Sequence, residues 1–390
     1  MTDETRPARE GSTAEVAPPR EPAGGDVFAD LYQVERPVIT RRERLMSVTG
    51  LVTSALVAVM ALLPSAYAIG GPGPTYDTLQ NDEAGALVSI SGAETFEPSG
   101  ELRLTTVSVQ DGGSQIMTMG SVLRGYLSEG QYTTPRELVF GTTEEEAEQQ
   151  QEQSRQQWVT SQEAATVSAL EALGTEVPAV LEVAEVAPES DAFGVLEKDD
   201  ILLAVDGEGL DGFSDLTAAV ESGTIGQVLT VTIERDGSQQ DVDFSLVDNG
   251  FGEPMMGVYI DPEFDLPIDV EVAIDSVGGP SAGLMFTLAI MDLLTEEDEL
   301  NGAAVAGTGT MNSTGDVGAI GGIDLKMIGA ERDGADWFLA PVANCAEVVG
   351  HIPEGLSVVA VEDIDDAYDA IVAIGAGQTA SLPTCEAVAG

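Results

Sequence analysis

The sequence predicts a multidomain protein of mixed α/β and α+β architecture that follows one N-terminal transmembrane helix. Its 390 residues suffice for two or three domains at roughly 100–200 residues each. Residues 45–69 form an apolar segment without charge, and roughly 20 apolar residues are enough to cross a bilayer. The remaining sequence alternates between strand-like and helix-like segments, which indicates that both elements contribute to its domains.

The residues around the apolar segment indicate its orientation. Arginines at positions 36, 41, 42 and 44 precede it, whereas the next basic residue after it is Arg103. By the positive-inside rule, residues 1–44 lie in the cytoplasm and the bulk of the chain lies outside the cell membrane. Residues 1–44 are rich in Pro, Gly, Glu, Arg and Thr without hydrophobic periodicity, so we expect a disordered tail.

A cleaved signal peptide is the alternative for residues 45–69. Ala66, Tyr67 and Ala68 have the small-residue pattern of a cleavage site. The 44 residues that precede the segment are too many for an ordinary signal sequence, which favours a permanent anchor. Both alternatives export the remaining chain.

Composition excludes several classes of function. The net charge of −53 repels phosphate backbones, so nucleic acid is not an expected partner. The two cysteines form no Cys-x-x-Cys or Cys/His cluster, so we expect no zinc site, and nothing in the sequence indicates a cofactor. In an exported chain two cysteines can oxidise, and we expect a disulfide between Cys345 and Cys385; two free thiols are the alternative.

Residues 70–173 are an exported N-terminal region. It opens with the sequence GGPGPTYDTL, which we interpret as a stiff exit from the membrane. Strand-like patterns follow at residues 85–91 and 101–109, and residues 143–173 predict one long helix whose second half is amphipathic.

Residues 174–250 resemble a PDZ domain of the bacterial, protease-associated type. A strand is expected at 179–186, and Lys198-Asp199-Asp200 leads into the buried strand and turn of residues 201–207. A short helix at 213–222 and a strand at 228–235 follow. The resemblance implies that extended peptides bind by adding a strand to a sheet edge, with a carboxylate-binding loop near residues 174–178. A domain that only positions its neighbour is the alternative.

Ser281 is a candidate nucleophile. It lies in Gly-Gly-Pro-Ser-Ala-Gly, between a predicted strand at 270–274 and an apolar helix that we expect to run from 281 to 294. Pro280 favours a helix start, and free N–H groups at a helix N-terminus favour developing negative charge. A simple helix-capping serine is the alternative.

Lys326 is the candidate general base. The chain has two lysines, Lys198 and Lys326, and one histidine, His351, which lies in a turn-like GHIPEG sequence. Apolar residues flank Lys326 in a helix-like segment, and a lysine removed from water there would be neutral near physiological pH. A lysine that snorkels from an ordinary amphipathic helix is the alternative.

These segments together resemble the proteolytic domain of Lon peptidases. The sequences GGPSAGLMFTLAIMDLL and AGTGTMNSTGDVGAIGGIDLKMIGAERDGADWFLAP carry its Ser–Lys pattern. The resemblance implies that Ser281 is the nucleophile, that Lys326 is the base and that Thr308 supports the pair. Backbone N–H groups near Gly279 and Ala282 are then expected to bind the oxyanion. The family's proline is Ala319 here, at a position without a catalytic role. The Lon-type domain is assigned to residues 251–378, followed by a C-terminal tail at 379–390.

The order of span, PDZ-like segment and Lon-type segment resembles membrane-anchored PDZ–Lon proteins of Gram-positive bacteria. That resemblance implies ATP-independent hydrolysis of exported or membrane proteins, and neither lysine follows a glycine, so the chain contains no Walker A motif. A hexamer is expected by analogy alone. Residues 83–125 loosely resemble the start of the Lon fold, which suggests a PDZ unit inserted into a discontinuous domain. A catalytically inactive, membrane-tethered PDZ adaptor is the alternative function.

Overall fold

A computed structural model of the chain describes residues 40–82, 85–110, 117–128, 130–274 and 277–389. Most of the tail predicted at residues 1–44, and part of the turn predicted after the strand at 270–274, lie outside these residues. The chain separates into two units, Met1–Val59 and Met60–Gly390.

Helix α1 (Arg41–Leu62) is long and apolar enough to cross a membrane, with a mean hydropathy of 2.1 over its most apolar 18 residues and no buried residue. By length and composition alone this is weak evidence for a span. The predicted segment 45–69 extends too far, because the helix ends at Leu62 and strand β1 (Tyr67–Asp77) begins five residues later. Pro64 lies between the two elements, and a proline lacks the N–H that a continuing helix requires.

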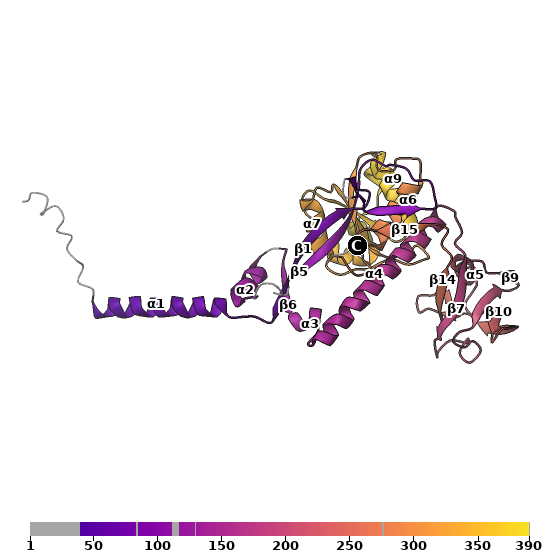
Figure 1. Cartoon of the computed structure of the whole chain (residues 1–390), viewed down its shortest axis with the longest axis horizontal. Coiled ribbons are helices and arrows are strands. Elements are labelled where there is room, and N and C mark those ends of the chain that lie inside the picture. Colours follow the sequence, from indigo (N-terminus) through magenta and orange to yellow (C-terminus); the bar gives the residue numbers. More distant parts are fainter. Residues whose placement is uncertain (1–39, 83–84, 111–116, 129, 275–276, 390) are drawn as a thin grey trace, which may run out of the picture. The chain divides into compact units, whose positions relative to one another are not determined.

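The first sheet contains strands from early and late parts of the chain (Figure 1). Its order is β20-β19-β16-β5-β1-β6. Strands β20, β19, β16 and β5 are parallel neighbours, whereas β1 runs antiparallel to both β5 and β6. The strands other than β1 are β5 (Glu101–Gln110), β6 (Tyr132–Pro135), β16 (Ala304–Gly307), β19 (Trp337–Pro341) and β20 (Ser357–Val361).

Pairing of β5 with β16 joins segments about 200 residues apart, with Glu101 opposite Ala304 and Leu104 opposite Gly307. The first sheet is therefore built from two separated parts of the chain, and the second sheet, β7 to β14, is an insertion between them. The Gly/Pro-rich segment that we interpret as a stiff exit from the membrane forms most of strand β1, which the sequence analysis did not predict as a strand. A shift in register between Pro72 and Thr75 lets this strand keep its pairing with β5 despite the prolines.

Helices cover both faces of this sheet. Because side chains alternate along a strand, Leu339 of β19 faces one core while Phe338 and Ala340 face the other. The first core includes α4 (Glu144–Ala172), α6 (Gly283–Leu294) and α9 (Ile364–Gly375). The second core includes α7 (Ile323–Arg332), α8 (Cys345–Val348) and α10 (Cys385–Ala389).

The second sheet belongs to the insertion and has the order β11-β10-β8-β7-β14, with helix α5 (Phe213–Glu221) packed against it. Figure 1 draws these elements as one lobe. Strand β14 (Val258–Phe264) pairs with β7 along its whole length, so the predicted domain end at residue 250 is too early. The remaining strands are β7 (Ala179–Val186), β8 (Ile201–Val205), β9 (Glu208–Gly209), β10 (Val228–Arg235) and β11 (Ser238–Ser245).

One apolar cluster holds both ends of the insertion. Val167 and Leu170 of α4 pack with Val177, which precedes β7, and with Ile268, which follows β14. Short ladders complete the fold: β15 with β4, β2 with β3, β12 with β13, and β17 with β18. Their bounds, with those of two further helices, are β2 (Asn81–Asp82), β3 (Gly85–Ala86), β4 (Val88–Ser91), α2 (Met119–Leu127), α3 (Arg136–Phe140), β12 (Val247–Asp248), β13 (Pro254–Met255), β15 (Asp269–Val272), β17 (Thr310–Met311) and β18 (Val317–Gly318).

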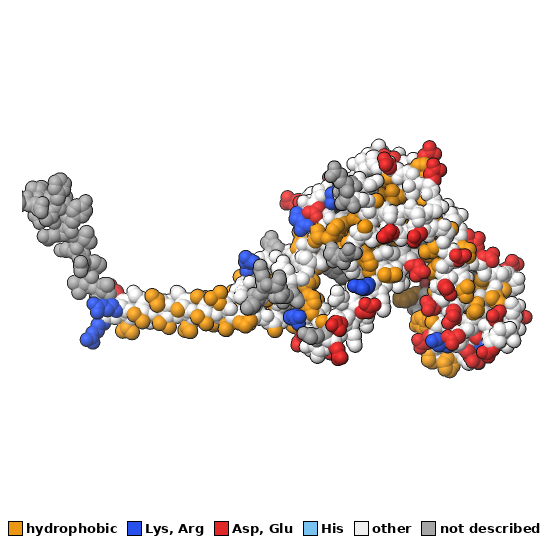
Figure 2. Space-filling model, in the orientation of Figure 1, with side chains coloured by type: hydrophobic (Ala, Val, Ile, Leu, Met, Phe, Trp, Pro, Cys, Tyr) orange, Lys and Arg blue, Asp and Glu red, His pale blue; other side chains and the backbone are white. Residues whose placement is uncertain are grey.

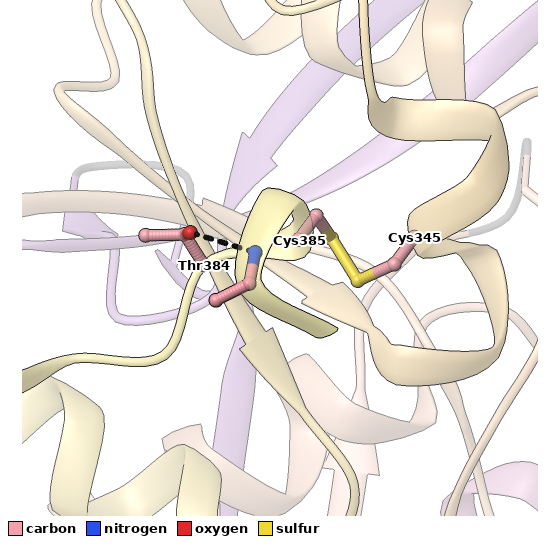
Figure 3. Close-up of a disulfide and its surroundings, with 4 residues drawn as sticks. Cys345, Thr384 and Cys385 are labelled. Carbon is pink, nitrogen blue, oxygen red and sulfur yellow. Dashed lines mark hydrogen bonds between the residues drawn. A yellow bond between two sulfur atoms is a disulfide. The ribbon is translucent and has the colours of Figure 1, made fainter. Parts of the chain in front are cut away.

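Cys345 and Cys385 form a disulfide with an S–S distance of 2.08 Å (Figure 3). Both residues are buried, and the bond ties α10 to α8 in the second core. The C-terminal residues predicted as a tail therefore include a helix that is covalently attached to the domain. On the surface, Asp and Glu side chains are scattered across the face that Figure 2 displays, in line with the net charge.

Candidate active site

Ser281, Thr308 and Lys326 meet at the carboxyl end of strand β16. The Lys326 Nζ lies 2.8 Å from the Ser281 Oγ and 2.7 Å from the Thr308 Oγ1. Ser281 precedes α6, Thr308 follows β16 and Lys326 belongs to α7, so three separate elements supply the three side chains. The fold thus brings together the three residues that the sequence singled out.

The position of Ser281 is set by its own carbonyl. That oxygen accepts hydrogen bonds from the Thr308 Oγ1 at 2.9 Å and from the Gly309 N–H at 3.0 Å. Helix α6 begins two residues later than predicted, at Gly283, and its N-cap is Ala282 without a side-chain hydrogen bond. The hydroxyl of Ser281 is therefore not used as a helix cap, and it faces Lys326 instead.

Lys326 is held in an apolar environment. Its side chain is 3% exposed, and the buried residues Ile323 and Met327 lie beside it on α7. Among the described residues no carboxylate forms an ion pair with its ammonium group. Burial lowers the pKa of Lys326 from its usual value of 10.5 to about 8, because the charged form loses water without gaining an anion.

Thr308 orients the lysine. Its hydroxyl donates to the Ser281 carbonyl, so only its lone pairs can receive an N–H of Lys326. A neutral amine that donates to Thr308 can direct its own lone pair at the Ser281 hydroxyl. Such an arrangement can remove the serine proton and create a nucleophile for acyl transfer.

The residues predicted to bind an oxyanion differ in their surroundings. The Gly279 N–H donates to the Ser154 carbonyl at 3.2 Å, so this group is already used. Gly279 has a φ of 84°, which an L side chain rarely adopts. Ala282 lines the same cleft as Ser281.

The cleft in front of Ser281 has a volume of about 550 Å³. One wall is strand β5 from Thr105 to Val109, and the opposite wall includes Val277 and Gly278. Strand β5 pairs with β16 only as far as Leu104, so beyond that residue this edge of β5 lacks a neighbouring strand among the described residues. The edge of β5 next to Ser281 is therefore open to pairing with an extended peptide.

Helix α4 supports the loop that precedes Ser281. The Ser161 Oγ donates to the Pro280 carbonyl at 3.1 Å, and the Ser154 carbonyl accepts from Gly279 as described above. Trp158, between these two serines, contacts Phe286 of α6 edge to face with ring centroids 5.2 Å apart. Sequence reasoning missed this role, although the spacing of residues 154, 158, 161 and 165 marks one face of the helix.

A second buried polar group lies at the far end of α6. Among the described residues, neither carboxyl oxygen of Asp292 has a hydrogen-bond partner. The neighbouring Glu299 accepts a hydrogen bond at its Oε1 from the Tyr368 hydroxyl at 2.6 Å. Burial, and then the neighbouring Glu299, raise the pKa of Asp292 to about 8. A protonated Asp292 can donate to Glu299, so this pair is consistent with a structural role at neutral pH.

An apolar groove lies between α5 and strand β14, with a volume of about 290 Å³. Leu216 and Val220 of α5 form one side, and residues 255–260 form the other. The segment 174–178, predicted to hold a peptide carboxylate, is not part of this lining. The segment instead lies beside α5, where the Pro178 backbone bridges to Gly212.

The remaining candidate residues have ordinary surroundings. His351 is exposed and its Nδ1 lies 3.0 Å from the Glu347 carbonyl. Carboxylates of Glu176, Asp211 and Asp215 lie close together, but Asp215 accepts from the N–H groups at the start of α5. This capping explains the position of Asp215 without an ion.

Residues 262–373 match the Lon protease (S16) C-terminal proteolytic domain, and this range contains Ser281, Thr308 and Lys326. The Lon protease of Clostridioides difficile is 32% identical over 117 residues, which are 28% of this chain and 15% of that protein. A mitochondrial Lon protease homolog of Eremothecium gossypii is 34% identical over 96 residues, 24% of this chain and 9% of that protein. The chain therefore spans only a small part of the length of these relatives.

Solved structures similar to this chain include the PDZ domain of an SdrC-like protein from Listeria monocytogenes. It is 19% identical with a TM-score of 0.20, and the match covers 21% of this chain and 86% of that one. A solution structure from Geobacillus thermodenitrificans is 26% identical with a TM-score of 0.19, over 20% of this chain and 94% of that one. The proteolytic domain of Lon proteases is thus the family to which residues 262–373 are similar.

If Ser161 positions the nucleophile loop, Ser161→Ala will slow covalent labelling of Ser281 by a fluorophosphonate. Loss of one hydrogen bond of about 1 kcal/mol corresponds to roughly a fivefold slower reaction. Ser161→Thr keeps the hydroxyl and is the matched control, which should retain most of the wild-type rate. An unchanged rate in Ser161→Ala, with unchanged thermal stability, would show that the contact is dispensable.

Proposed function

We propose that the protein is a membrane-anchored serine endopeptidase that uses a Ser281–Lys326 dyad. The observation that carries the proposal is the 2.8 Å contact between the Ser281 Oγ and a buried lysine that forms no ion pair with a carboxylate among the described residues. A lysine with a pKa of about 8 is neutral in a useful fraction of molecules near physiological pH. The similarity of residues 262–373 to the proteolytic domain of Lon proteases supports the same reaction class.

In the proposed reaction, neutral Lys326 accepts the Ser281 proton while the serine oxygen attacks the peptide carbonyl carbon. The carbonyl oxygen becomes an oxyanion near the N-terminus of α6, where backbone N–H groups and the helix dipole favour negative charge. Protonated Lys326 then gives its proton to the leaving amine. Water hydrolyses the acyl-enzyme by the same route, with Lys326 again as the base.

The proposed substrates are extended segments of exported or membrane proteins. The unpaired edge of β5 supports this, because it can hold a peptide backbone beside Ser281. The groove between α5 and β14 supports binding of a second extended segment, in the manner of a PDZ domain. No Walker A motif occurs in this sequence, which supports hydrolysis without ATP.

The proposed location is the cell membrane, with α1 as a single span and the two sheets outside the cytoplasm. Arg41, Arg42 and Arg44 at the start of α1 support this orientation. Cleavage after Ala68 would cut within β1, where Ala68 is fully buried and pairs with Thr134. The position of this site inside a paired strand supports a retained anchor. A hexameric ring is proposed only by analogy with Lon-type domains.

The second candidate function is a catalytically inactive adaptor that binds peptides through the α5–β14 groove. The groove supports peptide binding, which the adaptor requires and which the peptidase can also use. The inactive adaptor does not account for the arrangement of Thr308, which donates to the Ser281 carbonyl while accepting from Lys326. The two candidates differ in whether Ser281 turns over a substrate.

Hydrolysis of an unfolded protein such as casein should require both residues of the dyad. Ser281→Ala and Lys326→Ala are each expected to lower the rate by at least about 10³-fold, since nucleophile and base act as a unit. Lys198→Ala is the matched control, because Lys198 is the other lysine of the chain and is largely exposed. Equal activity of the wild type and the three variants would contradict the proposed dyad. A wild type without activity under varied conditions would favour the inactive adaptor.

Filling the α5–β14 groove should weaken binding of protein substrates without impairing the chemistry. Val220→Trp places a large side chain in the groove and is expected to raise the KM for casein, while turnover of a short peptide ester stays unchanged. Val228→Trp is the control, because Val228 is an exposed residue of β10 outside the groove. Equal KM values for the two variants would show that the groove does not bind the substrate.

A further inference from the structure

Helix α2 carries an exposed apolar face. Met119, Leu123, Tyr126 and Leu127 are 46%, 59%, 73% and 73% exposed. Their spacing of four, three and one residues places them on one side of the helix. The opposite side is attached to the domain, because Gly125 is buried against Ile69 of β1. Exposing this apolar face to water is energetically unfavourable, so we expect a partner to cover it.

Further exposed apolar side chains lie on elements that pack near α2. Helix α2 packs against β1 and β6, and helix α3 packs against the same two strands. We define the α2 patch as the four residues of α2 together with exposed apolar residues of these elements and of the segment before β1: Leu63, Tyr67, Tyr132 and Leu138.

Backbone hydrogen bonds join the start of α2 to the segment that directly follows α1. The Met119 N–H donates to the Leu63 carbonyl at 2.9 Å, and the Ser65 N–H donates to the Met117 carbonyl at 2.8 Å. Pro64 and Thr118 also form a β-bridge. Leu63 is the first residue after α1, so these bonds hold the start of α2 within one residue's reach of the end of α1.

The local charge of the α2 patch also differs from the rest of the chain. Between Asp111 and Glu137 the sequence contains one acidic residue, Glu129, although the chain as a whole has a net charge of −53. Arg124 and Arg136 lie within or beside the patch. A phospholipid headgroup surface would therefore repel the patch less than the net charge of the whole chain implies.

We propose that the α2 patch lies in the interface of the membrane that α1 crosses, with its apolar side chains among the headgroups and upper acyl chains. This inference rests on the proposed membrane anchor. Tyrosine at positions 67, 126 and 132 suits this depth, because its ring is apolar and its hydroxyl reaches water. Amphipathic helices of this kind insert their apolar face by roughly 5–10 Å.

A docked α2 patch would hold β1 and β6 against the bilayer. Strand β1 is a neighbour of β5, whose free edge lines the cleft of Ser281. The membrane contact would thus fix the catalytic domain at a constant height above the surface. Substrate segments that emerge from the bilayer close to the protein would then reach the cleft more readily than segments of freely diffusing proteins.

The test measures tryptophan quenching in the full chain, reconstituted into vesicles of phosphatidylcholine with brominated acyl chains. Leu123→Trp should lose most of its added emission in the brominated vesicles, and in vesicles without bromine its emission should lie to the blue of that of Phe251→Trp. Phe251→Trp is the control for an exposed apolar residue outside the patch, since Phe251 is 91% exposed, and it should be unaffected. Val52→Trp in α1 reports the span itself, and the wild-type emission of Trp158 and Trp337 is subtracted throughout.

The outcomes separate the inference from the proposed anchor. If Val52→Trp is quenched while Leu123→Trp behaves like Phe251→Trp, the α2 patch does not touch the membrane and the anchor stands. If Val52→Trp is not quenched, the anchor and the inference are both wrong. If Leu123→Glu with Tyr126→Glu lowers the mass of the detergent-solubilised particle, the patch joins copies of the chain, and the membrane assignment is overturned.

Discussion

The burial of one lysine is the constraint on which the rest of the account depends. Lys326 can act as the proposed base only while its ammonium form is disfavoured, and no anion among the described residues offsets its loss of water. An acidic protein with a net charge of −53 could easily place a carboxylate nearby, which would raise the pKa again. Instead the contacts of Nζ are two hydroxyl groups, which orient the amine and leave its charge uncompensated.

The pocket that holds this lysine depends on both halves of a divided domain. Strand β5 comes before the insertion and β16 after it, and their pairing places the cleft wall beside Thr308. Helix α4 connects the first half to the insertion, and its Ser161 supports the loop of the nucleophile. The same helix packs against both ends of the insertion through Val167 and Leu170. The insertion is therefore linked, through this apolar cluster, to the helix that contacts the residue before Ser281.

The sequence predicted the candidate site residues better than their supports. Ser281 and Lys326 could be identified because each lies in a short pattern with a chemical meaning and because lysine is scarce, whereas Thr308 followed from the resemblance to Lon peptidases. Strand β1 was missed because its Gly and Pro residues are typical of turns, and only pairing with β5 makes it a strand. Strand β14 was assigned to the wrong domain because its partner β7 lies about 75 residues earlier. The contacts of Ser154 and Ser161 depend on tertiary packing, which local patterns do not contain.

Titration of the Lys326 side chain by NMR tests the central claim most directly. Labelling with ¹⁵Nζ-lysine yields two side-chain signals, because the chain contains two lysines, and Lys198→Gln assigns them. The account predicts that the Lys326 signal titrates with a pKa of about 8, and that labelling of Ser281 by a fluorophosphonate accelerates as pH rises through the same value. A Lys326 that stays protonated up to its usual pKa of 10.5, while Ser281 reacts at neutral pH, would contradict the dyad.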